Sequence, residues 1–88
     1  MTPEAAELLA IQALGYLAGD HEQLARFLAL TGIAPEDLRE AATSPSFLSG
    51  VLDFFSGDEA TLLAFAASAG ADPTDVAAAR EVLSRHVE

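Results

Sequence analysis

At 88 residues the chain has the length of one small domain, and 14 acidic side chains against four arginines and no lysine give it a net charge of −10. That charge repels a phosphate backbone, so no direct binding of nucleic acid is expected. Solubility is the commoner reason for an acidic excess, and the alternatives are a basic partner or mimicry of nucleic acid. The lack of cysteine excludes disulfides and thiolate metal sites, and no apolar run is long enough to span a membrane, so we expect a cytoplasmic protein that binds no membrane.

Capping residues and prolines mark three helices in the first half of the chain. Thr2 precedes Pro3, which stands at the first helical position, where the missing N–H of proline costs no hydrogen bond. Asp20 is placed to cap the second helix with Gln23 at the capping-box position, and Pro35 opens the third. Glycines follow the first two helices and end them. These signals predict helices over about residues 3–18, 21–30 and 35–42.

The second half carries the same kinds of signal in the same order. Ser44 precedes Pro45, Asp58 is a capping residue, and Asp72 precedes Pro73. They predict helices over about residues 45–56, 59–69 and 73–86. No segment alternates between apolar and polar residues over the length of a strand, so the chain is expected to be all-α.

The order of these signals reflects an internal repeat. Residues 19–42 (GDHEQLARFLALTGIAPEDLREAA) align without a gap with residues 57–80 (GDEATLLAFAASAGADPTDVAAAR), at a constant offset of 38. Nine of the 24 aligned pairs are identical: Gly19/Gly57, Asp20/Asp58, Leu24/Leu62, Phe27/Phe65, Ala29/Ala67, Gly32/Gly70, Pro35/Pro73, Asp37/Asp75 and Ala41/Ala79. Such a periodicity indicates that one supersecondary unit occurs twice.

Most of the repeated residues have a role in folding. Gly32 and Gly70 are predicted to adopt a left-handed backbone conformation, which penalises any residue with a side chain. Asp37 and Asp75 stand at the third helical position, two residues after their prolines, where a carboxylate is expected to accept hydrogen bonds from N–H groups of the first helical turn.

Two copies are too few for a solenoid, which needs about three repeats to bury a continuous core. We therefore expect one domain, residues 1–88, in which repeat 1 (about 4–42) and repeat 2 (about 43–87) face each other about a pseudo-twofold axis. The expected fold is a compact orthogonal bundle of about six short helices, three from each 38-residue repeat. An open, two-lobed arrangement is the alternative.

Few residues could carry chemistry. The histidines are His21 and His86, and the chain has no cysteine or lysine that could serve as a nucleophile beside them. No other metal-ligating residue is spaced from His21 so that both could bind the same ion. We therefore expect no enzyme, no catalytic or metal residues and no cofactor. The segment Leu24–Leu38 has the residue pattern of a helix-turn-helix motif, but its second helix carries acidic residues where a DNA-binding protein needs basic ones.

The first helix has more apolar surface than one buried face requires. The inward face is expected to consist of Ala6, Leu9, Ala13, Tyr16 and Leu17. A second, narrower stripe consists of Leu8, Ile11 and Gly15, whose repeat counterparts are polar: Ser46, Ser49 and Asp53. This stripe is a candidate surface for a partner helix or for self-association, unless the terminal helix packs differently and buries both faces.

Three segments carry a family resemblance: Leu14–Ala18 (LGYLA), Leu24–Leu28 (LARFL) and Gly32–Leu38 (GIAPEDL). Through them nearly the whole chain resembles a family of small, all-helical bacterial proteins known only as a domain of unknown function, number 3572. The resemblance implies a helical fold and a bacterial cytosolic setting, and it brings no catalytic residue.

Two functions follow as hypotheses. The first is a non-enzymatic interaction or adaptor module that uses the stripe to hold a protein partner or a second copy of itself. The alternative is a protein that binds a small ligand in an apolar pocket between the repeats, where four aromatic side chains would converge: Tyr16, Phe27, Phe54 and Phe65.

Overall fold

The computed structural model describes residues 1–85 and, within them, contains six α-helices, one 3-10 turn and no strand. His86, where the last helix was expected to end, lies outside the described residues. The all-helical prediction is confirmed, and the helix bounds agree with the capping signals to within a residue except around the third helix. The elements are α1 (Pro3–Ala18), α2 (His21–Thr31), the 3-10 turn η1 (Pro35–Asp37), α3 (Leu38–Ala41), α4 (Pro45–Ser56), α5 (Glu59–Ala69) and α6 (Pro73–Arg85).

Side-chain caps start three of these helices. The Thr2 hydroxyl accepts a hydrogen bond from the Ala5 N–H at 3.2 Å, and Asp20 Oδ1 accepts from the N–H of Glu22 at 3.1 Å and of Gln23 at 3.3 Å. Asp58 Oδ1 accepts from the Thr61 N–H at 3.3 Å. Each cap satisfies backbone donors that have no partner within the helix, which is why these residues fix the helix starts.

The two repeated glycines end α2 and α5 as predicted. Gly32 has φ of 73° and Gly70 has φ of 68°, and no other residue of the described chain has positive φ. Both therefore lie in the left-handed region, which is accessible to glycine at no steric cost.

The third helix is shorter than predicted. In place of one helix over residues 35–42 there is η1 followed by the single turn of α3. Pro45 forces an extended backbone at Ser44, which has φ of −96° and ψ of 124°, so the chain must leave the helix there. The α6 segment has no proline at the corresponding point and continues to Arg85.

The expectation for the two repeated acids is met at neither of them. Asp75 Oδ2 accepts a hydrogen bond at 3.2 Å, but the donor is the N–H of Asp72, which precedes the helix, and not an N–H of the first turn. Asp37 closes the 3-10 turn, and its side chain makes no capping hydrogen bond to α3. The expectation for Asp37 is therefore wrong, because the tighter turn replaces the first α-helical turn that it would have capped.

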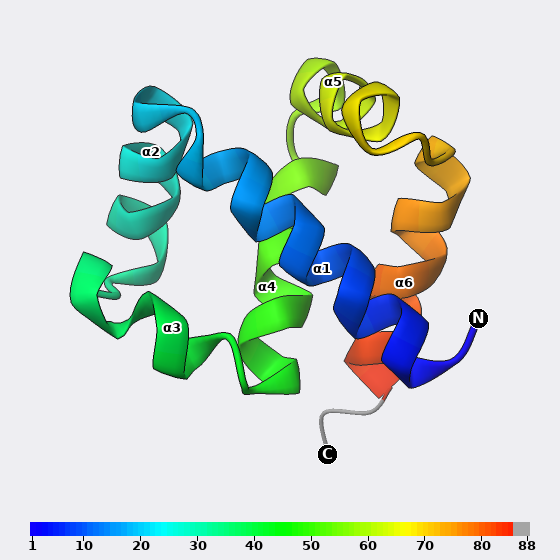
Figure 1. Cartoon of the computed structure of the whole chain (residues 1–88), viewed down its shortest axis with the longest axis horizontal. Helices are drawn as coiled ribbons and strands as arrows, with labels where there is room; N and C mark the ends of the chain where they lie inside the picture. Colours follow the sequence, from blue (N-terminus) through cyan, green and yellow to red (C-terminus); the bar gives the residue numbers. More distant parts are fainter. Residues whose placement is uncertain (86–88) are drawn as a thin grey trace.

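The helices form two flanks around a crossing pair (Figure 1). Helices α1 and α4 cross near the centre, with α2 and α3 on one side and α5 and α6 on the other. Helix α5 is seen almost end-on while α1 and α4 lie across the view, so the bundle is not a parallel one. The radius of gyration is 11.8 Å. A compact chain of this length has about 12 Å, which favours the closed arrangement over the two-lobed alternative.

The core lies where α1, α4 and α6 meet. Its buried residues are Ala6, Leu9, Ala10, Ala13, Leu17, Phe27, Leu48, Val51, Leu52, Phe55, Phe65, Val76, Ala79 and Leu83. Alanines supply most of the buried face of α1, so that neighbouring helices approach closely. Tyr16, expected on this face, is half-buried. None of the described helices has the length and apolar character that crossing a lipid bilayer requires.

Candidate interaction site

An apolar groove separates α1 from α3. Its walls are formed by Ile11, Leu14, Gly15 and Ala18 of α1 and by Leu38, Arg39 and Ala42 at α3. The groove has a volume of about 330 Å³, and Arg39 is its one charged lining residue. Two of the three residues of the predicted stripe, Ile11 and Gly15, thus line the groove.

Leu8 extends this apolar surface along α1. It lies one turn before Ile11 on the same helix face, and the two side chains are 63% and 47% exposed, respectively. The stripe of Leu8, Ile11 and Gly15 therefore lies at the surface and not in the core. Two large aliphatic side chains exposed one turn apart form a patch, whereas a single exposed leucine would need no explanation.

Small residues keep the groove open. Gly15 contributes no side chain, and a Cβ atom placed on it would meet no atom within 4 Å. Ala18 and Ala42 contribute one methyl group each. Half-buried Leu14 and Leu38 reach into the remaining space from the two sides.

The corresponding place in the second half is polar. The counterparts of Gly15 and Ala42 are Asp53 and Arg80, whose side chains pair across α4 and α6. They line a depression of about 270 Å³ together with Ala77, Glu81 and Ser84. The apolar lining of the groove is therefore a feature of the first half.

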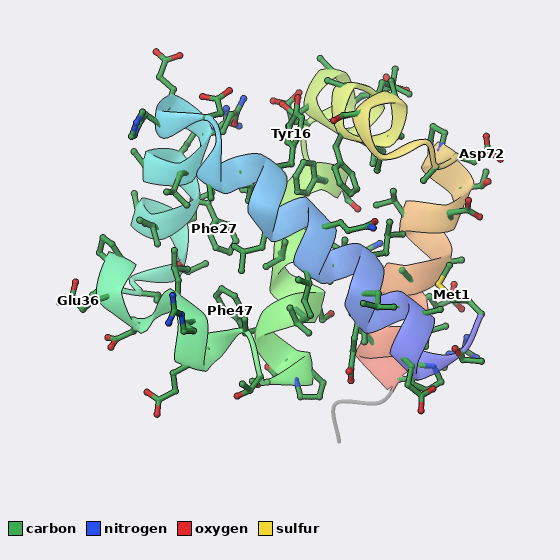
Figure 2. The ribbon with its side chains drawn as sticks, viewed as in Figure 1. Met1, Tyr16, Phe27, Glu36, Phe47 and Asp72 are labelled. Carbon is green, nitrogen blue, oxygen red and sulfur yellow. The ribbon has the colours of Figure 1, made fainter. Side chains whose placement is uncertain are left out.

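Acidic side chains lie near the stripe and near α3. Glu4 and Glu7 lie on the face of α1 that carries Leu8 and Ile11, because they precede them by four residues each. Glu36, Asp37 and Glu40 are exposed around α3. Figure 2 shows Glu36 projecting outward from this end of the molecule. These five acids outnumber Arg39, which gives this part of the surface a negative potential.

The four aromatic side chains assigned to a pocket lie together but fill the space themselves. Tyr16 contacts Phe65 at 5.7 Å between ring centroids, and Phe27 contacts Phe54 at 5.5 Å. Phe55, which the sequence interpretation did not include, joins the two pairs and is fully buried. These distances are those of rings in direct contact. The sequence signal for Phe55 was its position next to Phe54 in an apolar run.

One open depression touches this cluster. It has a volume of about 400 Å³ and is lined by Tyr16 and Phe65 together with Gln12, Ser68 and Ala69. Phe27 lies on the other side of α1, where Figure 2 places it near Phe47, and their ring centroids are 5.7 Å apart. The four residues thus do not line one common pocket.

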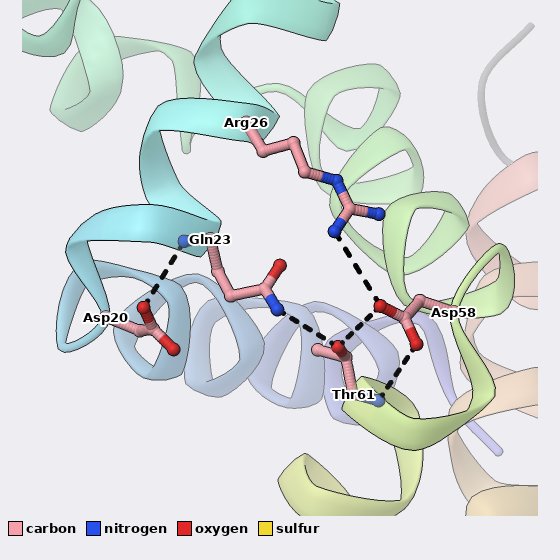
Figure 3. A network of polar contacts seen from close by, with 5 residues as sticks. All are labelled: Asp20, Gln23, Arg26, Asp58 and Thr61. Atoms are coloured by element: carbon pink, nitrogen blue, oxygen red, sulfur yellow. Dashed lines mark hydrogen bonds and ion pairs between the residues drawn. The ribbon is translucent and has the colours of Figure 1, made fainter.

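A polar network joins α2 to the start of α5 (Figure 3). Gln23 Nε2 donates to Thr61 Oγ1 at 3.2 Å, and Thr61 Oγ1 donates to Asp58 Oδ2 at 2.9 Å. Arg26 lies 3.8 Å from Asp58 Oδ2 and also stacks on the ring of Phe54 at 5.5 Å. The hydrogen bonds from Thr61 hold the pKa of Asp58 below its ordinary value of 3.8. Gln23 does not close the predicted capping box, because its side chain contacts the other half of the chain.

The candidate chemical residues are dispersed. His21 is exposed in the first turn of α2, and His86 is outside the described part of the chain. Among residues 1–85, no three or more histidine, aspartate or glutamate side chains are grouped so that they could hold a metal ion. In the segment with the helix-turn-helix outline, the second helix is only the four residues of α3.

One comparison with known proteins gives a match. The sequence model of a family described as "Protein of unknown function (DUF3572)" matches residues 3–86. No curated protein and no solved structure matches the chain.

Proposed function

The chain belongs to the DUF3572 family of proteins of unknown function, and we propose that it is a non-enzymatic interaction module that holds a helix of another protein in the groove between α1 and α3. The main support for this proposal is that the apolar surface formed by the exposed side chains of Leu8 and Ile11 continues directly into an apolar groove. A partner helix commonly binds such a groove with apolar side chains on one face.

The repeat supports this choice of surface. Leu8, Ile11 and Gly15 are replaced by Ser46, Ser49 and Asp53 in the second half, so a fold built from this unit does not need the apolar residues. Side chains that folding does not require and that water does not favour are explained by a binding partner.

We further propose that the two halves are related by a pseudo-twofold axis. Two observations support this arrangement. Gln23 and Thr61 are equivalent positions and hydrogen-bond to each other. Tyr16 is equivalent to Phe54, and Phe27 is equivalent to Phe65, so the contact Tyr16–Phe65 in one direction corresponds to the contact Phe54–Phe27 in the other. Such reciprocal contacts are expected at an isologous interface.

The test of the proposed function is the double variant Leu8→Ser and Ile11→Ser. Both side chains are largely exposed, so the free energy of unfolding should change by less than about 0.5 kcal/mol per substitution. Capture of proteins from a lysate of the source cells should be lost. The matched control is Leu30→Ser with Leu63→Ser, which removes leucines that are 72% and 49% exposed elsewhere.

Urea unfolding and pull-down then decide the matter. Loss of capture in the stripe variant alone supports the proposal. Equal capture by wild type and stripe variant contradicts it, and so does a loss of several kcal/mol of stability, because that would place the stripe in the core.

The small-ligand alternative has one supporting observation, the depression beside Tyr16 and Phe65. It receives less support than the groove, because the rings expected to line a pocket between the repeats pack against one another. A thermal-shift screen tests it. A compound that raises the melting temperature of wild type but not of Tyr16→Ala would support the alternative.

A further inference from the structure

No helix of the described chain covers the face that corresponds to the stripe in the second half. After Arg80, helix α6 continues through Arg85 against α1 and α4, with Leu83 fully buried. The stripe counterparts Ser46 and Asp53 nevertheless stay exposed. Their side chains are polar and suit contact with water, whereas Leu8 and Ile11 leave an apolar surface that a second molecule would have to cover.

The charge of the occupant follows from the acids near the apolar surface. Glu4 and Glu7 lie on the face of α1 that carries the stripe, and Glu36, Asp37 and Glu40 are exposed around α3. A second copy of the chain would bring another net charge of −10 to this surface, which opposes association. A positively charged helix is attracted to it.

We propose that the groove and the stripe bind a cationic amphipathic helix of a partner protein. This inference rests on the proposed function and adds the partner's chemistry. Apolar side chains of that helix cover Leu8 and Ile11, and its lysines or arginines meet Glu4 and Glu7.

The probe is a synthetic helix of about 18 residues, a length that gives substantial helicity in isolation. It has leucines at helical spacing on one face and lysines elsewhere, and a second peptide has glutamate in place of every lysine. Calorimetry with the full chain should give saturable binding of the lysine peptide alone. Raising the salt to about 1 M should increase its Kd about tenfold or more, because the Debye length falls to about 3 Å. Binding of both peptides with equal Kd would overturn the proposal.

The groove itself is tested by placing the polar pair of the second half in it. Gly15→Asp with Ala42→Arg introduces the residues that pair as Asp53 and Arg80, leaves the net charge unchanged and meets no atom within 4 Å at the new Cβ of residue 15. The Kd for the lysine peptide should rise about tenfold or more. An unchanged Kd in this variant, with folding confirmed by circular dichroism, would place the peptide elsewhere and overturn the proposal.

A charge-matched pair separates local from general attraction. Glu4→Gln with Glu7→Gln should weaken binding of the lysine peptide more than Glu59→Gln with Asp72→Asn, which removes the same charge on the flank formed by α5 and α6. Equal weakening would show attraction to the whole acidic molecule and overturn the proposal. If the lysine peptide does not bind while the stripe variant still loses its lysate partner, the occupant is wrong and the proposed function stands. Dimerisation of wild type that the stripe variant abolishes would assign the groove to a second copy.

Discussion

The repeated glycines allow the cost of one backbone conformation to be measured within a single protein. Gly32 has φ of 73°, whereas Gly50 lies inside α4 without positive φ. A Cβ atom added at either position would meet no atom within 4 Å. Alanine at the two sites therefore differs in backbone conformation and not in steric contact.

The two substitutions should change stability in opposite directions. Each removes the conformational freedom that glycine has in the unfolded chain, which stabilises the fold by about 0.4–1 kcal/mol. Gly50→Ala has only this gain. Gly32→Ala must also adopt the left-handed conformation, at a cost of about 1–2 kcal/mol, and is destabilised overall. Gly32→Val and Gly70→Val should each lose about 1–2 kcal/mol or more, because a branched Cβ fits this conformation less well.

Urea unfolding of wild type and the variants measures these differences, and thermal melts check them. In a domain of this size, 1 kcal/mol corresponds to a shift of about 4–8 °C in melting temperature. If Gly32→Ala and Gly50→Ala shifted stability by the same amount in the same direction, the left-handed turn would not be what selects glycine at residue 32. Gly32→Asn is a further check and should lose less than Gly32→Val, because asparagine tolerates this conformation.

Two further predictions concern ionisable groups. Because the pKa of Asp58 lies below 3.8, the contribution of its carboxylate to stability is present above that pH and is lost as the pH falls through the folded-state pKa. Asp58→Asn should therefore lose less stability than wild type when urea melts are repeated at acid pH. An identical loss in the two proteins would contradict this. Zinc should leave the melting temperature unchanged, since His21 is exposed and no cluster of metal-ligating side chains surrounds it among the described residues. A stoichiometric zinc site that His21→Ala abolishes would contradict this and reopen an enzymatic role.

The positions of helix ends could be predicted from the sequence because the interactions that set them are local. Thr2, Asp20 and Asp58 cap donors two or three residues away, and Gly32 and Gly70 adopt left-handed turns between adjacent elements. The apolar spacing of α1 likewise identified most of its buried face, although it included the half-buried Tyr16 and did not include the buried Ala10.

Contacts between segments that are distant in sequence could be identified only from the tertiary structure. Gln23 has the sequence position of a capping-box residue, yet its side chain donates to Thr61, 38 residues away. Phe55 completes the aromatic cluster only because α4 crosses α1 between α2 and α5.

That Leu8, Ile11 and Gly15 differ in character from their repeat counterparts follows from the sequence alone, since that comparison needs only the alignment of the two halves. The exposure of this stripe and its continuation into a groove follow from the tertiary structure. Helix α3 ends after a single turn, before the extended backbone that Pro45 imposes at Ser44, whereas α6 continues to Arg85. How far a helix extends over its neighbours is a property of packing that residue spacing within the helix does not contain.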